Sequence, residues 1–340
     1  MAADHSTAPF TALADLASAR VGGRAIAAND DFFASKSNLV RPGPAVFVPG
    51  KFTSRGKWMD GWESRRRRTP GNDWCVVALG MRGVVRGVNV DTSHFSGNQP
   101  SHCSIDAVDD RSGPSKDAYG AEGGPWTPIL ARSALTGNSN NFFPIADERP
   151  WTHLRLNIFP DGGVARLRVY GDAAVDWNRL RRDKRVVDLA SILNGGLVLG
   201  ASDMHFGARD NLIMPGRAAN MGDGWETRRR RGEGYDWAIV RLGAPGLISR
   251  VEIDTNHFKG NYPEAASIEG CRAPEATLDR LASTVTTWRE ILARTRLKAN
   301  YRHYFSKELV VSEPITHVRL NIFPDGGISR LRIHGHVAAD

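Results

Sequence analysis

The chain has 340 residues, 41% of them hydrophobic, which is enough for about two domains with cores of their own. Its formal net charge of +8 first indicates a nucleic-acid partner, but arginine far outnumbers lysine, and arginine suits planar contact with a carboxylate better than diffuse neutralisation of phosphates. The three cysteines lack CxxC spacing, no apolar run could span a bilayer, and the N-terminus lacks the order of a signal peptide, so we expect a soluble, reduced, cytoplasmic protein.

Long blocks of sequence occur twice, which predicts a duplicated domain. We divide the chain into an N-terminal extension (1–14), a first repeat (15–171), a linker (172–187) and a second repeat (188–340). The interval between matching residues shortens from 173 (Asp15 to Asp188) to 163 (Asp60 to Asp223). About ten extra residues therefore lie in the first copy, within the Pro- and Gly-rich stretch from Arg41 to Gly56, which is typical of a surface loop.

The first doubled block is Asp-Gly-Trp-Glu followed by Ser or Thr and four arginines, starting at Asp60 and again at Asp223. On a strand, Arg65 and Arg67 would share one face. An edge strand whose charges only discourage sheet pairing is the plain alternative, but the repetition favours a binding role for at least one arginine of each run. Glu63 precedes Arg65 by two positions, so the two side chains would share a face, either as a salt bridge or as part of a site.

The second doubled block is Asp-Thr-x-His-Phe-x-Gly-Asn, which follows predicted strands over 84–91 and 248–254. It places His94 and Asn98 in a polar loop of the first copy and His257 and Asn261 in the second. Histidine is the usual proton shuttle near neutral pH. A satisfied structural histidine is the alternative, and the two are about equally favoured.

The third doubled block ends each repeat. Alternating runs at 154–158 and 166–170 flank Pro-Asp-Gly-Gly and predict a hairpin, as do 318–322 and 330–334 in the second copy. Residues 277–292 are the one stretch compatible with a helix. Many short strands with turns between them predict an all-β protein of two tandem jelly-roll sandwiches.

These three blocks, in this order and in both copies, resemble those of the allantoicase family over nearly the whole chain. The resemblance implies two jelly-roll repeats related to galactose-binding or discoidin-like domains. It also implies hydrolysis of allantoate to ureidoglycolate and urea, within purine and allantoin degradation. It carries over no assignment of catalytic residues, and it leaves open which repeat is active.

Allantoate has one carboxylate and two ureido groups on a single carbon, so a site for it needs a cation and hydrogen-bonding partners. Our hypothesis assigns general base catalysis to Glu63 or Glu226 and general acid catalysis to His94 or His257. It assigns the substrate carboxylate and ureido groups to the following side chains: Arg65, Arg67, Asn98, Arg228, Arg230 and Asn261. No cofactor is certain, and a divalent metal that polarises the ureido carbonyl is an alternative route.

The expected partners are the small anionic substrate and further copies of the chain in a homo-oligomer, with neither nucleic acid nor a membrane. Two other classes of function stay open at this point. One is a non-catalytic discoidin-like module that binds a small anion or a sugar. The other is a nucleic-acid-binding protein, which would show aromatic residues interleaved with Lys and Arg on an open face.

Overall fold

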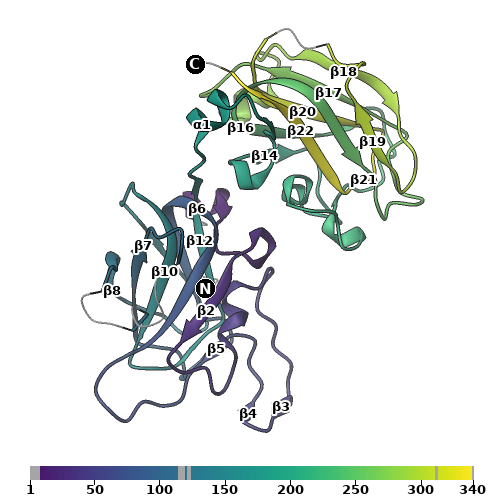
Figure 1. Ribbon diagram of the computed structural model, residues 1–340. Helices are drawn as coiled ribbons and strands as arrows, with labels where there is room; N and C mark the ends of the chain where they lie inside the picture. Colours follow the sequence, from purple (N-terminus) through teal and green to yellow (C-terminus); the bar gives the residue numbers. More distant parts are fainter. Residues whose placement is uncertain (1–7, 114–118, 121–123, 311–312, 339–340) are drawn as a thin grey trace. The chain divides into compact units, whose positions relative to one another are not determined.

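The computed structural model describes residues 8–113, 119–120, 124–310 and 313–338. The chain forms two compact units, Met1–Ala174 and Val175–Asp340, each an antiparallel β-sandwich (Figure 1). Within the described residues, every helix is too short or too polar to cross a bilayer.

The first unit consists of β-strands joined by loops and short 3₁₀ helices. Its elements are, in chain order, η1 (Pro9–Ala12), β1 (Ala14–Asp15), η2 (Ala19–Val21), β2 (Arg24–Ala28), η3 (Lys36–Val40), β3 (Phe52–Thr53), β4 (Gly56–Lys57), β5 (Trp62–Glu63), β6 (Asp73–Asp91), β7 (His102–Val108), β8 (Thr127–Ala134), β9 (Asn140–Pro144), β10 (Pro150–Phe159), β11 (Gly163–Val164) and β12 (Arg166–Ala173).

The long strand β6 belongs to both layers of the sandwich. Its first part pairs with β2 and β10, and its second part pairs with β12 and β9. The first layer continues from β10 to β7 and β8, and the second from β12 to β1. Because side chains alternate along a strand, one face of each layer supplies fully buried residues such as Val88, Leu156 and Leu167 to the core between them.

The second unit repeats this plan. Its elements are α1 (Trp177–Arg182), β13 (Val186–Asp188), η5 (Ile192–Asn194), β14 (Leu197–Ala201), η6 (Arg209–Ile213), η7 (Met221–Asp223), β15 (Trp225–Glu226), β16 (Asp236–Asp254), β17 (Ala265–Cys271), α2 (Leu278–Ala282), β18 (Arg289–Arg296), β19 (Arg302–Phe305), β20 (Ile315–Phe323), β21 (Gly327–Ile328) and β22 (Arg330–Val337). Strand β16 takes the place of β6 and pairs with β14 and β20, then with β22 and β19. The predicted all-β fold of two antiparallel sandwiches is confirmed.

The predicted hairpin at the end of each repeat is wrong. Strands β10 and β12 both pair with β6, in different layers, and β11 lies between them in the chain. The Pro-Asp-Gly-Gly turn, which follows a cis Phe159–Pro160 bond, leads into β11, and β11 pairs with β5. The turn therefore joins two layers, and it holds the Asp-Gly-Trp-Glu segment at the rim of the sandwich.

Two smaller predictions also fail. The arginine runs are not strands, because β5 and β15 end at Glu63 and Glu226. In the stretch 277–292 only α2 is helical, and β18 begins at Arg289. The edge of the sheet supplies backbone partners to β18, and that tertiary pairing overrides the local helical pattern.

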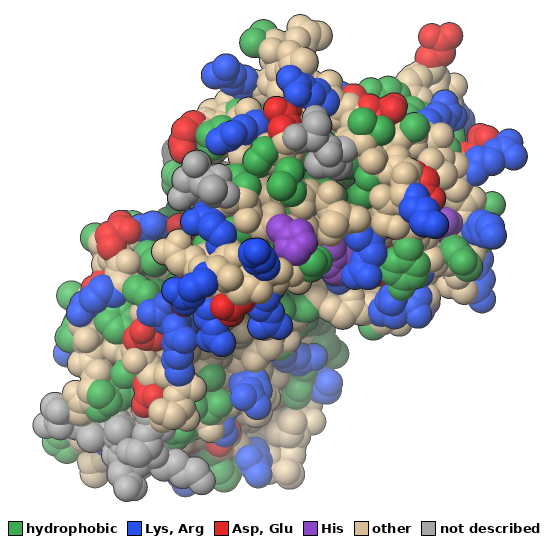
Figure 2. Space-filling model, turned by 45° about the horizontal axis from the view of Figure 1, so that its top comes forward, with side chains coloured by type: hydrophobic (Ala, Val, Ile, Leu, Met, Phe, Trp, Pro, Cys, Tyr) green, Lys and Arg blue, Asp and Glu red, His purple; other side chains and the backbone are tan. Residues whose placement is uncertain are grey.

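Arginine inside each sandwich is neutralised by carboxylates. Arg166 and Asp60 form a buried ion pair at 2.6 Å, and Arg330 and Asp223 form its counterpart at 2.9 Å. On the face shown in Figure 2, Lys and Arg side chains are numerous, with Asp and Glu side chains among them. The first residue of the Asp-Gly-Trp-Glu block, Asp60 or Asp223, thus contributes an ion pair to the fold of each repeat.

Candidate active site

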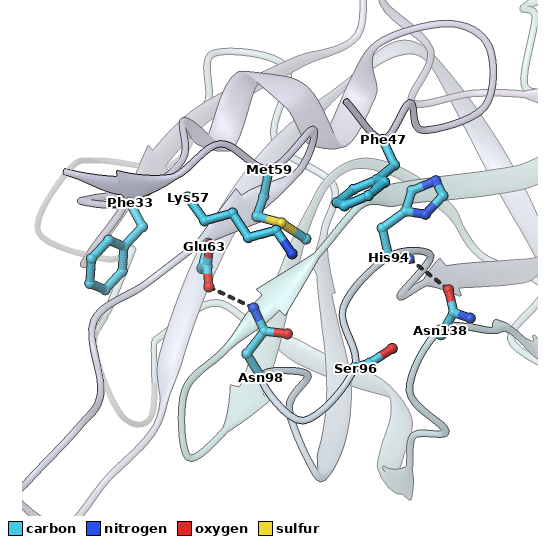
Figure 3. A pocket seen from close by; sticks show the side chains of 10 residues that line it. Phe33, Phe47, Lys57, Met59, Glu63, His94, Ser96, Asn98 and Asn138 are labelled. Carbon is cyan, nitrogen blue, oxygen red and sulfur yellow. Dashed lines mark hydrogen bonds between the residues drawn. The ribbon is translucent and has the colours of Figure 1, made fainter. Parts of the chain in front are cut away.

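A cleft of about 540 Å³ opens at the rim of the first unit (Figure 3). Residues from β4, β5, the loop after β6 and the loop before β9 come together there. Its lining consists of Phe33, Phe47, Gly56, Lys57, Met59, Glu63, His94, Ser96, Asn98 and Asn138. Three residues predicted from the sequence, Glu63, His94 and Asn98, therefore share one cleft.

Glu63 is fixed by its backbone on both sides. Its strand β5 pairs with β11, where Glu63 lies opposite Gly163, and its N–H donates to the carbonyl of Ala34 at 3.1 Å. The neighbouring Trp62 is fully buried, and its Nε1 donates to the carbonyl of Asp30 at 2.8 Å. Anchoring Trp62 in the core orients the next side chain, Glu63, toward the cleft.

The Glu63 carboxylate is poised to exchange a proton. Burial raises its pKa above the ordinary value, against the opposing influence of a hydrogen bond from Asn98 and of the nearby Lys57 charge. Asn98 Nδ2 donates to Glu63 Oε1 at 2.8 Å, the contact drawn in Figure 3. A carboxylate with a raised pKa is a stronger base than an exposed one, which suits general base catalysis.

His94 is held in an uncommon backbone conformation, with φ at 68°. Its N–H donates to Asn138 Oδ1 at 2.8 Å, and Asn138 is itself left-handed with φ at 49°. The ring stacks on Phe47 at a centroid distance of 5.6 Å, and Nε2 lies 3.3 Å from the carbonyl of Ala45. A carbonyl only accepts, so Nε2 carries the hydrogen and Nδ1 is left to exchange a proton.

Lys57 is the cation of this cleft, and the sequence did not point to it. It lies in β4, in the segment between Ala45 and Asp60, which is longer in the first copy, and its Nζ lies 4.8 Å from the centroid of the Phe47 ring. In Figure 3 its side chain extends toward the middle of the cleft. Comparison of the two copies could not find it, because the second copy lacks the segment that carries it. Asn138 was also missed, although Asn300 repeats its role.

The arginines expected in the site are engaged elsewhere. Arg65 Nε donates to Asp30 Oδ2 at 2.6 Å, and Arg67 Nη1 donates to Asp73 Oδ1 at 2.9 Å. The Arg67 backbone N–H also donates to Asp161 Oδ2 at 2.8 Å, which ties the arginine run to the Pro-Asp-Gly-Gly turn. Neither arginine lines the cleft, because the run is a loop and not a strand with one face toward it.

The second unit assembles the same three side chains. His257 has φ at 71°, and its N–H donates to Asn300 Oδ1 at 2.8 Å. Asn261 Nδ2 donates to Glu226 Oε1. Arg228 pairs with Asp203 at 3.0 Å and Arg230 pairs with Asp236, so these arginines repeat the structural contacts of Arg65 and Arg67.

The surroundings of this second constellation differ. His94 approaches the carbonyl of Ala45, and His257 approaches that of Ala218 at 2.9 Å, so these alanines correspond. From Ala45 to Asp60 the first copy has ten residues more than the second copy has from Ala218 to Asp223. The segment with Phe47 and Lys57 is therefore missing from the second copy, and Met221 Sδ lies 3.4 Å from Asn261 Nδ2 there. Glu226 is only 9% exposed.

The part of the chain that the structure describes contains neither a metal-binding cluster nor an exposed thiol. No group of three or more His, Cys, Asp or Glu side chains is arranged there to hold a metal ion. Cys75, Cys103 and Cys271 are unpaired and buried, and burial raises the pKa of Cys103 to about 12 and that of Cys271 to about 11. These thiols are protonated at neutral pH and act as small apolar core residues.

The cleft can therefore hold a small anion against a base and an acid. Lys57 supplies a positive charge, Asn98 keeps its side-chain oxygen available as an acceptor, and Glu63 and His94 can exchange protons. Phe33, Phe47 and Met59 add apolar walls. Such a set of groups fits general acid–base chemistry on a compact polar molecule.

A protein-family model described as "Allantoicase repeat" matches the chain twice, over residues 14–174 and 187–338. The chain is 50% identical over 321 residues to a probable allantoicase of Burkholderia mallei, with 94% of each chain covered. It is 48% identical over 340 residues to a probable allantoicase of Pseudomonas aeruginosa, with 98% of each covered.

Solved structures agree with these relatives. The crystal structure of allantoicase from Saccharomyces cerevisiae superposes with a TM-score of 0.79 at 32% identity, covering 95% of this chain and 93% of that one. A second solved allantoicase gives a TM-score of 0.80 at 31% identity, with 96% and 94% covered. The likeness spans both repeats.

Proposed function

The chain belongs to the allantoicase family, and from this premise we propose that it hydrolyses allantoate to ureidoglycolate and urea in the cleft of its first unit. One observation supports placing the active site in the first unit: Glu63, His94 and Lys57 line the same cleft, and burial raises the pKa of Glu63, the base among them. A non-catalytic binding module would need the cation and the pocket but not the paired proton donor and acceptor.

The first unit is the working copy in this proposal. Both units carry the Glu, His and Asn, but the positive charge and the aromatic wall come from the segment between Ala45 and Asp60, which only the first unit has in full length. Allantoate is an anion, so a site without a cation would bind it weakly. In the second unit Met221 borders Asn261 in the corresponding region.

Each part of the substrate has a partner in the cleft. The Lys57 ammonium pairs with the substrate carboxylate as a point charge, a task that we first expected of arginine. Asn98 Oδ1 accepts an N–H of one ureido arm, since its Nδ2 already donates to Glu63. Phe47 and Met59 shield the ion pair from water and thereby strengthen it.

The reaction then needs one proton removed and one delivered. Glu63 takes a proton from the ureido nitrogen that stays on the central carbon, and the electron pair of that N–H bond forms a C=N bond. The bond from the central carbon to the other ureido nitrogen breaks as His94, which enters this step with a proton on Nδ1 as well as on Nε2, gives the Nδ1 proton to that nitrogen, so urea leaves. Water adds to the resulting imine carbon, one of its protons passes to the imine nitrogen, and ureidoglycolate forms. The proton held by Glu63 then passes through solvent to His94, which restores both side chains. Each proton transfer contributes about 10²–10⁴-fold to the rate.

The proposal is tested with matched variants of the two repeats. Urea and ureidoglycolate release from allantoate are followed for the unaltered chain, for Glu63→Gln and His94→Gln, and for Glu226→Gln and His257→Gln. We expect kcat to fall about 10²–10⁴-fold in the first pair and to stay within about twofold in the second pair. Full activity of both first-repeat variants would refute the mechanism, and loss confined to the second pair would move the site to the second unit.

Two further expectations are measured on the same preparations. Assembly into a homo-oligomer is part of the proposal, and sedimentation velocity gives the number of copies. Turnover before and after treatment with a chelator, with a divalent cation added back, measures whether a metal takes part beside Glu63 and His94.

A further inference from the structure

A second cavity, of about 690 Å³, lies on the sheet of the second unit and shares no residue with the cleft described above. It opens over β13, β22, β16 and β19, together with the loop that carries Arg217. Four of its lining residues are arginines, namely Arg217, Arg250, Arg302 and Arg332. The reaction proposed for the first unit uses none of them.

Strand register brings these side chains onto one face. In one row across the sheet, Asp188 of β13 lies opposite His334 of β22, and His334 lies opposite Arg250 of β16. In the next row, two residues along each strand, Arg332 lies opposite Glu252, which lies opposite Tyr304. Side chains two residues apart on a strand point to the same side, so the rows form one continuous polar surface.

The matching face of the first unit is closed by an aromatic side chain. There Tyr170 lies opposite Gly87, at the positions of His334 and Arg250. Phe10 of η1 packs on Tyr170 and Phe142 at centroid distances of 6.0 and 6.3 Å.

The residue at position 87 makes that closure possible. A Cβ on Gly87 would lie 2.5 Å from the Phe10 ring, so only glycine leaves room for the ring. Arg250, at the matching position of the second unit, has a long charged side chain instead, and the face there is open. The two repeats therefore have the same strand pairing at this face, but an aromatic ring covers the face in the first unit, whereas the face in the second unit is charged and open.

Three of the four guanidinium groups of the open face are paired with carboxylates. Arg302 Nε lies 3.0 Å from Glu252 Oε1, Arg332 Nε lies 3.6 Å from Asp188 Oδ2, and Arg217 Nε lies 3.4 Å from Asp254 Oδ2. Arg332 also donates to the carbonyls of Met214 and Gly216 at 2.5 and 2.8 Å. Arg332 Nη1 is buried and has no hydrogen-bond partner within the described parts of the chain. Among the residues that the structure describes, Arg250 forms no ion pair, and its side chain borders the cavity.

The acidic and neutral groups limit what can bind. Asp188 and Glu252 line the same cavity, so they lower its net positive charge and offer acceptors to a ligand with N–H or O–H groups. Burial raises the pKa of Asp188 to about 6. Burial and the charges of Arg250 and Arg332 lower the pKa of His334 to about 4, so this imidazole is neutral at physiological pH and can donate or accept.

We propose that this cavity of the second unit is a binding site for a small carboxylate that also carries N–H or O–H groups. The arginines hold the carboxylate, with Arg250 as the principal contact because its guanidinium pairs with no carboxylate of the described residues. Glu252 and Asp188 accept from the remaining donors of the ligand. Binding there is separate from the reaction in the first unit.

The test titrates the full chain with N-carbamoylglycine, which has one carboxylate and one ureido group, in a calorimeter. The titration uses the Lys57→Ala background, where the cleft of the first unit has lost its cation. We expect one binding event, weakened roughly 10- to 100-fold by Arg250→Ala and less by Arg250→Lys. The control Arg229→Ala removes an exposed arginine outside the cavity and should leave the isotherm unchanged.

A second variant and two further probes serve as additional controls. Tyr304→Phe, which introduces the residue type of Phe142 at the matching position of the first unit, should also weaken binding. Arg250→Ala and Tyr304→Phe should both keep the thermal midpoint and, in the chain with Lys57 intact, the allantoate turnover. Acetate and inorganic phosphate should bind at least tenfold more weakly than N-carbamoylglycine. The proposal is overturned if Arg250→Ala and its parent give the same isotherm. Equal binding of phosphate would overturn the requirement for N–H or O–H donors.

Discussion

Glu63 and Lys57 set the charge state of the proposed catalytic cleft together. Burial raises the pKa of Glu63, and the Lys57 charge and the Asn98 hydrogen bond act in the opposite direction. A general base works only when ionised, so turnover should fall as the pH drops through the pKa of Glu63, which lies above the ordinary 4.5. The part of the pH–rate profile in which turnover falls toward low pH is its acidic limb. Any change that removes the positive charge of Lys57 must move this limb to higher pH.

The first prediction concerns Lys57→Met. Without the ammonium the ionised form of Glu63 loses a stabilising charge, so its pKa rises further and the acidic limb of kcat/KM against pH shifts upward. KM for allantoate should rise as well, because the carboxylate of the substrate loses its partner. Steady-state kinetics across the acidic pH range measure both effects.

Lys51→Met is the matched control for this prediction. Lys51 lies in the same inserted segment, but its Nζ lies 3.9 Å from the centroid of the Trp58 ring, and it does not line the cleft. Its removal should leave the limb in place. A limb that moves equally in both variants would mean that the net charge of the loop acts on Glu63, and not Lys57 itself.

Residue types could be predicted from the sequence where both copies keep them. Glu63, His94 and Asn98 were found because the doubled blocks preserve them, and the structure brings them together. Arg65 and Arg67 are preserved equally well, but for bonds to Asp30 and Asp73 that hold the loop. Repetition thus marks residues needed by the fold and residues of the site alike, and only coordinates separate the two.

At the scale of elements, the site depends on the packing of β11 against β5. Gly163 of β11 faces the Phe95 ring so closely that a Cβ would lie 1.9 Å from it, and Phe95 adjoins His94 in the chain. Gly327 has the same relation to Phe258, at 2.0 Å. The glycines are required at these positions because the aromatic ring fills the space that a side chain would occupy.

The second prediction compares Gly163→Ala with Gly327→Ala. Each added methyl group must displace a fully buried ring, so each variant should lose about 1–3 kcal/mol of stability. Movement of Phe95 also shifts His94, so Gly163→Ala should lower kcat at least tenfold at a temperature where the chain is folded. Gly327→Ala should keep kcat near that of the unaltered chain. Denaturant unfolding and urea release are the two measurements, and equal kcat values would argue against the first-unit site.

The existence of the strands could be predicted from alternating polarity, but not how they pair. The runs on either side of Pro-Asp-Gly-Gly indicated a hairpin, whereas the turn carries the chain from one layer to the other. The sequence of the two runs does not indicate that both pair with β6, which is long enough to pair with each of them in a different layer. For the same reason the sequence could not show that β5 would have β11 as its partner.

At the scale of the whole molecule, duplication gives two sandwiches whose cores are separate. Leu167 of β12 and Leu331 of β22 are equivalent core residues, both fully buried, each within its own unit. The inserted segment that brings Lys57 favours catalysis in the first unit, and the open arginine-lined face favours ligand binding in the second. A change in the core of one unit should therefore affect only the function proposed for that unit.

The last prediction tests this division with Leu167→Ala and Leu331→Ala. Loss of a buried leucine costs about 2–5 kcal/mol, so each variant should unfold its own unit several degrees earlier in a calorimetric scan. Each variant is assayed at a temperature between the unfolding transition of its altered unit and that of its unaltered unit. There, Leu331→Ala should still release urea from allantoate, whereas Leu167→Ala should not. Neither mutated residue lines the cleft, so a difference between the variants reports which unit must be folded. Loss of turnover at the same temperature in both would show that the first unit cannot work without the second.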